Sequence, residues 1–328
     1  MIKKTLLILP YFGKLPNYFD IYLKSVSFNP EFNWLLITDD QSAYDFPSNM
    51  TVLYQSFNEL KKQIQSKFDF TVNLETPFKL CDFRPSFGHI FSEYLSEYDY
   101  WGHCDPDIIW GKLSNFIDYE KLYEYDKIFT LGHLSIYKNS TANNLRFLEK
   151  IEGERYYKKV FSEPFAFGYD ELFNKSINSI FLNYNYPLFT ENYAADIDPY
   201  FSQFRLNIHQ SNGEYLLQHK CDQLFLWKNG ILERYFLENG KLMNQEFCYI
   251  HLQKRKMNHH TITSLDDQFI ILPFHFKNIN QQLTFSNFSN YYSKIWFNKQ
   301  YFKVKFKSLK FKLKHFNHYY SFSALLKK

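Results

Sequence analysis

Two aspartates one residue apart, Asp105 and Asp107, are the residues of this chain whose spacing best suits chemistry. An aromatic stretch, Tyr98–Trp101, precedes them and an apolar run begins at Ile108. Pro106 has a fixed φ and disfavours a helical conformation at the residue before it, so both carboxylates can face one side of an extended segment. Mg²⁺ and Mn²⁺ prefer such oxygen ligands, often together with substrate phosphates. The spacing predicts a metal–diphosphate site, and the alternative is a polar turn after a buried strand.

A parallel sheet is the structure that would position these acids. Short apolar runs at residues 5–9, 33–38 and 51–55 alternate with helix-forming segments at 17–27 and 58–68. This alternation is typical of an α/β fold with a mostly parallel sheet and helices on both faces. Ligands of such sheets bind beyond the carboxyl ends of the strands.

The ends of the first two predicted strands carry further candidates. Pro10 and Tyr11 follow the first strand, and Asp39 and Asp40 follow the second. Because the carboxyl ends of parallel strands share one edge, we expect these residues beside the two aspartates. The alternative for Asp39 and Asp40 is a solvated turn or a helix cap.

With these features the chain resembles bacterial glycosyltransferases of the GT-A fold, whose Asp-x-Asp motif serves a nucleotide-sugar site. The closer likeness is to capsule and surface-polysaccharide transferases, and the more distant one is to retaining transferases of the glycogenin type. The likeness covers residues 3–255. It implies a GT-A-like, Rossmann-like domain over residues 1–265, Mn²⁺ or Mg²⁺ as cofactor, and a nucleotide-sugar donor such as a UDP-sugar. In that family the first strand end and the acids after the second cradle the nucleoside.

The resemblance also assigns the segment before the metal motif. There the family carries a basic residue and an acid that hold the donor's phosphates and sugar hydroxyls, and Lys79, Asp82 and Arg84 match in kind. Arginine binds phosphate or carboxylate through a two-pronged contact, and lysine acts as a point charge. The alternative is a surface pair between Asp82 and Arg84 that contributes little.

Two later segments match the family as well. Asp170 and Glu171 stand where a carboxylate touches the donor sugar or the acceptor, and either would be the base if the reaction inverted. Their alternative is a pair of acids at a helix N-terminus. His251 ends an aromatic strand and would be the third metal ligand, with Lys254 on the diphosphate. The Gly and Pro-Trp of the glycogenin pattern are missing, so the basic residue that meets phosphate stays open. The late histidine favours retention.

Two other polar positions are interpreted as structural. His133 ends a predicted strand at residues 126–133, and a histidine in such a position is more often structural than catalytic. Asp196 and Asp198 repeat the Asp-x-Asp spacing. Because no apolar strand flanks them, this repeat predicts a loop.

Charge divides the chain into two parts. Of the 38 Lys and Arg residues, eleven lysines follow Asp267, whereas none of the 34 Asp and Glu residues does. We therefore expect a basic, helical C-terminal appendage over residues 266–328. Its apolar residues recur at helical spacing with lysines beside them: Phe302, Phe306, Leu309, Leu313 and Phe316. Such a basic amphipathic helix suits an anionic membrane surface. The alternatives are an edge strand and a helix packed back on the domain, and no nucleic-acid-binding module accompanies it.

The remaining features bound the location and the function. Four cysteines lack metal-type spacing, which is typical of reduced thiols in a cytosolic protein. The N-terminal apolar run is short for a signal peptide, and no stretch approaches the roughly 20 apolar residues of a membrane span. We expect a cytoplasmic enzyme, peripheral at the inner face of the membrane, that extends a surface, capsular or lipid-linked glycan. The alternatives are a nucleotidyl- or phosphotransferase with the same metal–diphosphate chemistry, and a non-catalytic glycan- or membrane-binding protein.

Overall fold

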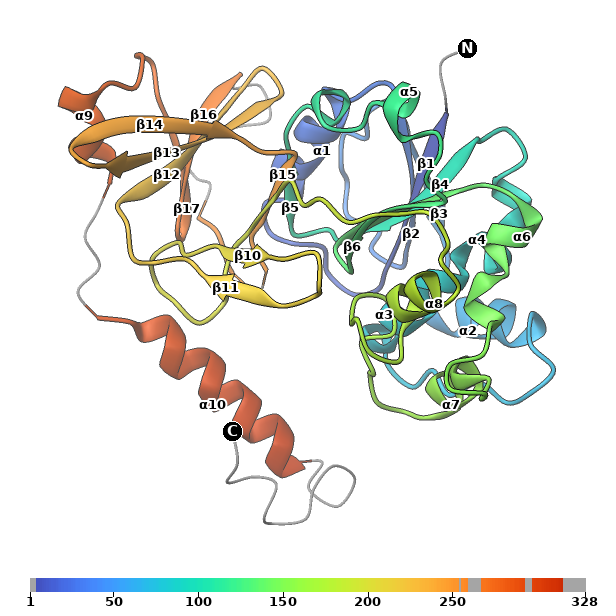
Figure 1. Ribbon diagram of the computed structural model, residues 1–328. Helices are drawn as coiled ribbons and strands as arrows, with labels where there is room; N and C mark the ends of the chain where they lie inside the picture. The colour runs from blue at the N-terminus through green and yellow to red at the C-terminus, as the bar shows by residue number, and fades with distance from the viewer. Residues whose placement is uncertain (1–3, 254, 259–266, 293–296, 315–328) are drawn as a thin grey trace.

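The computed structural model describes residues 4–253, 255–258, 267–292 and 297–314. Figure 1 shows two lobes side by side, one built on a large sheet flanked by helices and the other on a smaller sheet of long strands. A short three-stranded sheet lies where the lobes meet, and a single helix projects below the second lobe (Figure 1).

The larger sheet has the strand order β3-β2-β1-β4-β7-β6-β8. The strands are β1 (Thr5–Tyr11), β2 (Phe32–Thr38), β3 (Met50–Tyr54), β4 (Tyr100–Cys104), β6 (Lys127–Leu131), β7 (Leu134–Lys138) and β8 (Leu188–Phe189). The first four run parallel, β7 runs antiparallel to both β4 and β6, and β8 is parallel to β6. The predicted α/β fold with a mostly parallel sheet is confirmed.

Helices cover both faces of this sheet because side chains alternate along its strands. Leu6 and Ile8 of β1 pack in one core with residues of α2 (Phe57–Ser66), α3 (Leu80–Phe83), α4 (Phe87–Ile90), α7 (Tyr156–Ser162) and α8 (Ile177–Asn183). Leu7 and Leu9 pack in a second core with residues of α1 (Phe19–Ser27) and α5 (Tyr119–Leu122). Burial on both faces explains why β1 reads as a continuous apolar run.

The second lobe is a five-stranded antiparallel sheet in the order β14-β13-β12-β16-β17. Its strands are β12 (Gln223–Lys228), β13 (Ile231–Glu238), β14 (Lys241–Glu246), β16 (Gln268–Leu272) and β17 (His275–Asn278). Because β16 pairs with β12 and then with β17, residues after 265 belong to this sheet. The predicted domain boundary at residue 265 is therefore wrong.

The small sheet between the lobes joins segments that are far apart in the chain. Its order is β5-β15-β9, with β5 at Ile108–Trp110, β15 at Tyr249–His251 and β9 at Ala194–Asp196. The register places His251 opposite both Ile108 and Asp196. Side chains from all three strands enter a core shared with the second lobe. The strand that follows the predicted metal motif is thereby held against the strand that ends in the predicted third ligand.

The C-terminal part contains α9 (Phe285–Tyr291) and α10 (Lys299–Lys314). The predicted amphipathic segment forms the projecting helix α10 (Figure 1). Its apolar side chains face outward, since Phe302 and Phe306 are 59% and 71% exposed. Phe316 lies outside the described residues. Within those residues, no helix combines the length and the apolar character needed to cross a membrane.

Candidate functional site

A cavity of about 1300 Å³ opens at the carboxyl ends of the parallel strands. Residues from both lobes line it, among them Tyr11, Asp105, Asp107, Tyr215 and His251. Tyr215 belongs to a short hairpin of β10 (Asn207–His209) and β11 (Tyr215–Leu217). The expected position of the ligand site, beyond the strand ends, coincides with this cavity.

Asp105, Asp107 and His251 meet in the cavity. The Nε2 atom of His251 lies 3.4 Å from a carboxylate oxygen of Asp107 and 3.9 Å from one of Asp105. One ligand atom from each of the three residues falls within 4.8 Å of the others. The antiparallel pairing of β15 with β5 produces this geometry, because it sets His251 opposite the residue after Asp107. The prediction that His251 would reach these acids is confirmed.

The electrostatics of this cluster fit a divalent cation. Burial raises the pKa of Asp105, Arg84 opposes that rise, and the charge of Asp107 adds to it. Burial by itself would lower the pKa of His251, but Asp107 and Asp196 raise it well above its ordinary value. Asp105 and His251 therefore both keep a proton more readily than usual when no cation is bound. Two carboxylate oxygens and one imidazole nitrogen form a donor set suited to Mn²⁺ or Mg²⁺ at the same position.

Arg84 connects this cluster to the acidic pair downstream. Its guanidinium forms ion pairs with Asp105 and, at 2.9 Å, with Asp170, and it donates to the backbone oxygen of Gly132 at 2.8 Å. The alternative of a surface pair between Asp82 and Arg84 is wrong, because Arg84 binds site acids instead. Burial raises the pKa of Asp170 to about 7, although Arg84 works against the rise.

Gly132 allows the two downstream acids to approach its backbone closely. A Cβ atom at this position would lie 2.7 Å from an oxygen of Asp170 and 2.8 Å from one of Glu171. The side chain of Glu171 is exposed and also lines the cavity. The alternative of helix N-terminal acids does not hold, since α8 begins later, at Ile177.

Only some of the residues that were expected to contact the nucleoside line the cavity. Pro10 and Tyr11 line the cavity. Asp39 instead accepts a hydrogen bond from the backbone N–H of Gly13 at 2.7 Å, and Asp40 pairs with Lys14 at 2.7 Å. These two acids therefore hold the loop that follows β1, and this loop rather than the acids reaches the cavity.

Lys79 and Asp82 are turned away from the cavity, contrary to the prediction. Lys79 is 1% exposed, and its ammonium donates to Asp82 at 2.7 Å and to the backbone oxygens of Val160 and Phe165. Asp82 also accepts from the backbone N–H of Phe167 and Tyr169. The pair anchors the segment that leads into Asp170, because each member satisfies the other and nearby backbone groups.

We expect Lys79→Met to lower the free energy of unfolding by about 3–5 kcal/mol, the cost typical of removing one partner of a buried ion pair. Asp82 would keep its backbone donors, so the fold should survive. Urea unfolding measures the loss. Lys67→Met is the matched control, because Lys67 forms only a loose surface pair with Glu93 at 3.6 Å and should change stability little. Unchanged stability in Lys79→Met would contradict the anchoring role.

The basic residues after His251 also differ in whether they reach the cavity or are buried in structural contacts. Lys254 lies outside the described residues. Arg255 is 4% exposed and donates to backbone oxygens of Pro273, Asp198 and Phe201. Lys256 is exposed and lines the cavity. Arg255 is thus structural, and Lys256 is available to an anionic ligand.

Asp196 is the site residue that the sequence interpretation missed. It is 4% exposed and lies behind His251, with 2.9 Å between a carboxylate oxygen and Nδ1 of the imidazole. The Asp-x-Asp repeat at this position was expected to be a loop, yet Asp196 ends strand β9. The strand had no recognisable signal because it contains two alanines, and it forms only by pairing with β15.

His133 is buried beside the same histidine. It is 6% exposed, its Nδ1 lies 2.8 Å from the hydroxyl of Tyr249, and its ring centroid lies 4.3 Å from that of His251. Burial lowers the pKa of His133 well below its ordinary value, and the neighbouring His251 lowers it further. His133 is therefore a neutral ring that packs against the candidate ligand.

Comparison with known protein families gives one match. A family model described as "Family of unknown function (DUF6625)" matches residues 7–280, a span that includes both lobes and all three candidate metal ligands. No curated protein matches the chain.

Proposed function

Because the chain belongs to DUF6625, a family of unknown function, we propose its activity from its own residues: a metal-dependent glycosyltransferase of the GT-A type. The donor would be a nucleotide sugar, in the first place a UDP-sugar, and the acceptor a surface, capsular or lipid-linked glycan. The observation that carries the proposal is the meeting of Asp105, Asp107 and His251 at the carboxyl end of a mostly parallel sheet. The cavity of about 1300 Å³ has room for a nucleotide sugar and an acceptor.

The residues around the cavity suit such a donor. A Mn²⁺ or Mg²⁺ ion held by Asp105, Asp107 and His251 would neutralise charge on the departing diphosphate. Tyr11 offers an aromatic surface to the nucleoside base at the end of β1. Arg84 holds a fixed positive charge beside the metal ligands, because Asp105, Asp170 and the Gly132 carbonyl fix its guanidinium.

The two downstream acids would take different roles. Asp170 is bound to Arg84 and buried, so it positions that cation. Glu171 is exposed and carries the acceptor-facing carboxylate. Retention, which the resemblance favours, needs no general base. In an inverting reaction the acceptor hydroxyl would attack the anomeric carbon, the sugar–diphosphate bond would break, and Glu171 would take the hydroxyl proton.

The proposal is tested by screening nucleotide sugars with and without Mn²⁺. A ligand at 100 times its Kd stabilises the native state by about 2.7 kcal/mol, so the correct donor should raise the melting temperature only when Mn²⁺ is present. Turnover should release a nucleoside diphosphate. Release of pyrophosphate would instead indicate a nucleotidyltransferase. Binding without metal-dependent turnover of any nucleotide sugar would indicate a non-catalytic protein.

The helix α10 supports placing the acceptor at a membrane. Lys303, Lys307 and Lys310 are exposed along it, and Lys307 also lines the cavity. The outward-facing apolar stripe supports membrane contact over the alternative of a helix packed back on the domain. Each lysine near an anionic leaflet contributes on the order of 1 kcal/mol, screened by salt. We propose that α10 holds the protein to the inner face of the cell membrane, where a lipid-linked acceptor would lie.

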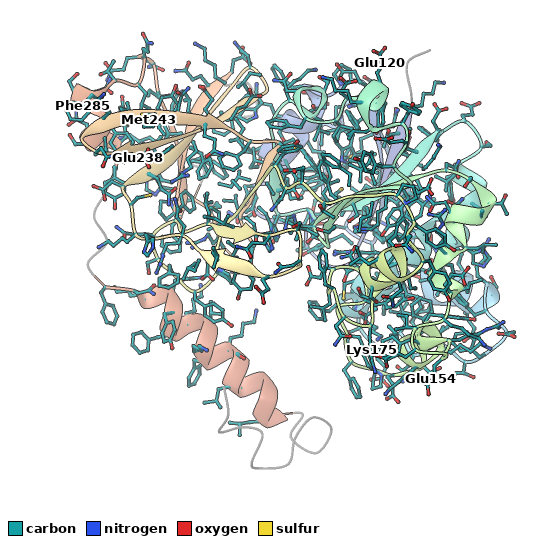
Figure 2. The ribbon with its side chains drawn as sticks, viewed as in Figure 1. Glu120, Glu154, Lys175, Glu238, Met243 and Phe285 are labelled. Carbon is teal, nitrogen blue, oxygen red and sulfur yellow. The ribbon has the colours of Figure 1, made fainter. Side chains whose placement is uncertain are left out.

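The double variant Phe306→Ser/Leu309→Ser should lose binding to anionic vesicles. Phe306 and Leu309 are 71% and 48% exposed, so the change removes insertable surface without disturbing the core. Co-sedimentation should show that the wild type binds anionic vesicles but not neutral ones. Its binding to the anionic vesicles should weaken at high salt. Met243→Ser is the matched control, since Met243 is 41% exposed on the side of the second lobe away from α10 (Figure 2). Equal sedimentation of wild type and double variant would contradict the membrane proposal.

A further inference from the structure

The carboxylate of Asp196 receives hydrogen bonds from four side chains that belong to two segments, residues 207–209 and 251–253. His251 approaches through Nδ1 at 2.9 Å and His209 through Nε2 at 2.9 Å. The amide nitrogens of Asn207 and Gln253 each donate at 3.0 Å. Four side-chain partners thus hold the Asp196 carboxylate in one orientation.

This carboxylate determines which nitrogen of His251 carries a proton. Both carboxylate oxygens already accept from amide nitrogens, Oδ1 from Gln253 and Oδ2 from Asn207, so the donor in the remaining bond is Nδ1 of His251. The neutral imidazole then has its lone pair on Nε2. That atom faces Asp107 at 3.4 Å and Asp105 at 3.9 Å. Asp196 thus selects the tautomer that can bind a cation between the ring and the two acids.

Asp196 also fixes the direction of the imidazole ring. It lies on β9, directly opposite His251 in the parallel pairing of β9 with β15. Two of its other partners, Asn207 and His209, belong to β10 in the hairpin that lines the cavity. The carboxylate is therefore held from the side opposite the metal ligands, and the ring cannot rotate without breaking its bond to Asp196.

We propose that Asp196 is the positioning residue for the metal ligand His251, and that through His209 it ties this ligand to the β10–β11 hairpin. The inference rests on the metal site of the proposed function. It assigns to Asp196, and not to Asp198, a role beside the first Asp-x-Asp pair. A metal-bound histidine commonly donates its other N–H to a carboxylate, and loss of that partner typically weakens metal affinity roughly 10- to 100-fold.

The test compares Mn²⁺ binding in Asp196→Asn and Asp198→Asn. Titration followed by electron paramagnetic resonance measures free Mn²⁺ directly and needs no turnover. Asp196→Asn should bind Mn²⁺ roughly 10- to 100-fold more weakly and lose the spin-echo modulation of a bound imidazole nitrogen. Asp198 is the matched control, because it lies two residues on and accepts from the backbone N–H of Tyr200. Asp198→Asn should keep the wild-type affinity, and circular dichroism confirms folding.

A second measurement uses the wild type alone, so it stands even if Asp196→Asn does not fold. Nitrogen-15 NMR of the Mg²⁺-loaded protein, with the His251 signals assigned through His251→Ala, should show the proton on Nδ1. An unchanged Mn²⁺ affinity in Asp196→Asn would overturn this inference and leave the metal site standing, whereas a proton on Nε2 would overturn it and also remove His251 from the metal ligands. Failure of the wild type to bind Mn²⁺ would overturn the metal site and this inference together.

Discussion

Replacing Asp107 by Asn should lower metal-dependent turnover by roughly 10³-fold, equal to about 4 kcal/mol of transition-state stabilisation, and leave the protein folded. Asp107 faces Nε2 of His251 at 3.4 Å, and its side chain is 25% exposed. Asn keeps the shape but removes the charge that a divalent cation needs. Removing one of two neighbouring carboxylates should not destabilise the native state.

Substituting Asp107 tests the metal site more directly than substituting Asp105, because Asp105 also forms an ion pair with Arg84. Asp105→Asn should lose comparable activity but would disturb the arginine as well. The control is Asp45→Asn, which changes an exposed aspartate. Activity should be measured against Mn²⁺ concentration with thermal unfolding in parallel. Full activity of Asp107→Asn at low Mn²⁺ would remove the central proposal.

Replacing Arg84 by Met should lower the free energy of unfolding by about 3–5 kcal/mol at pH 8, the cost typical of breaking a buried ion pair. The Arg84 side chain is 18% exposed and lies between Asp105 and Asp170, of which Asp170 is 3% exposed. Without the cation, both carboxylates would remain in poorly solvated surroundings. Urea unfolding as a function of pH measures the loss.

The loss should depend on pH with a defined sign. The pKa of Asp170 is already raised from 3.8 to about 7, and removal of Arg84 would raise it further. Between the ordinary and the raised value, the native variant binds a proton that the unfolded chain does not. Its stability therefore falls as the pH rises through this window. Because Asp170 of the wild type also keeps its proton up to about pH 7, the deficit of Arg84→Met should change little below pH 7 and grow above it.

A double-mutant cycle separates this effect from lost packing. Adding Asp170→Asn to Arg84→Met removes the uncompensated charge, so part of the stability should return and the pH dependence should weaken. A deficit that stays constant with pH would show that the guanidinium contributes packing rather than charge compensation.

Much of the sheet and the metal cluster could be predicted, because the signals are local. Buried parallel strands are apolar runs, and a strand end places its polar residues at the ligand edge. This rule alone was enough to predict Asp105 and Asp107 as site residues, whereas predicting His251 as the third ligand also required the resemblance to the glycogenin-type family. The pairing of β15 with β5 then supplied the contact.

The missed features depend on long-range pairing or on burial. Lys79 looked available because a lysine is usually solvated, but backbone oxygens some 80 residues further on surround it. Asp196 looked like a loop residue because two alanines give no periodic signal. The boundary at residue 265 failed because it was drawn from the change in charge, whereas β16 pairs back to β12 across β13, β14 and β15.

The three-stranded sheet has a consequence for biosynthesis. Both aspartates emerge early from the ribosome, whereas His251 is made near the end of the chain and Asp196 lies between them. Contacts between segments so far apart form late in folding, because the intervening loop must close first. A nascent or prematurely terminated chain that lacks β15 would hold two neighbouring carboxylates with no third ligand. Under the proposed function, a chain that ends before β15 would therefore lack a complete metal site and would not consume a sugar donor.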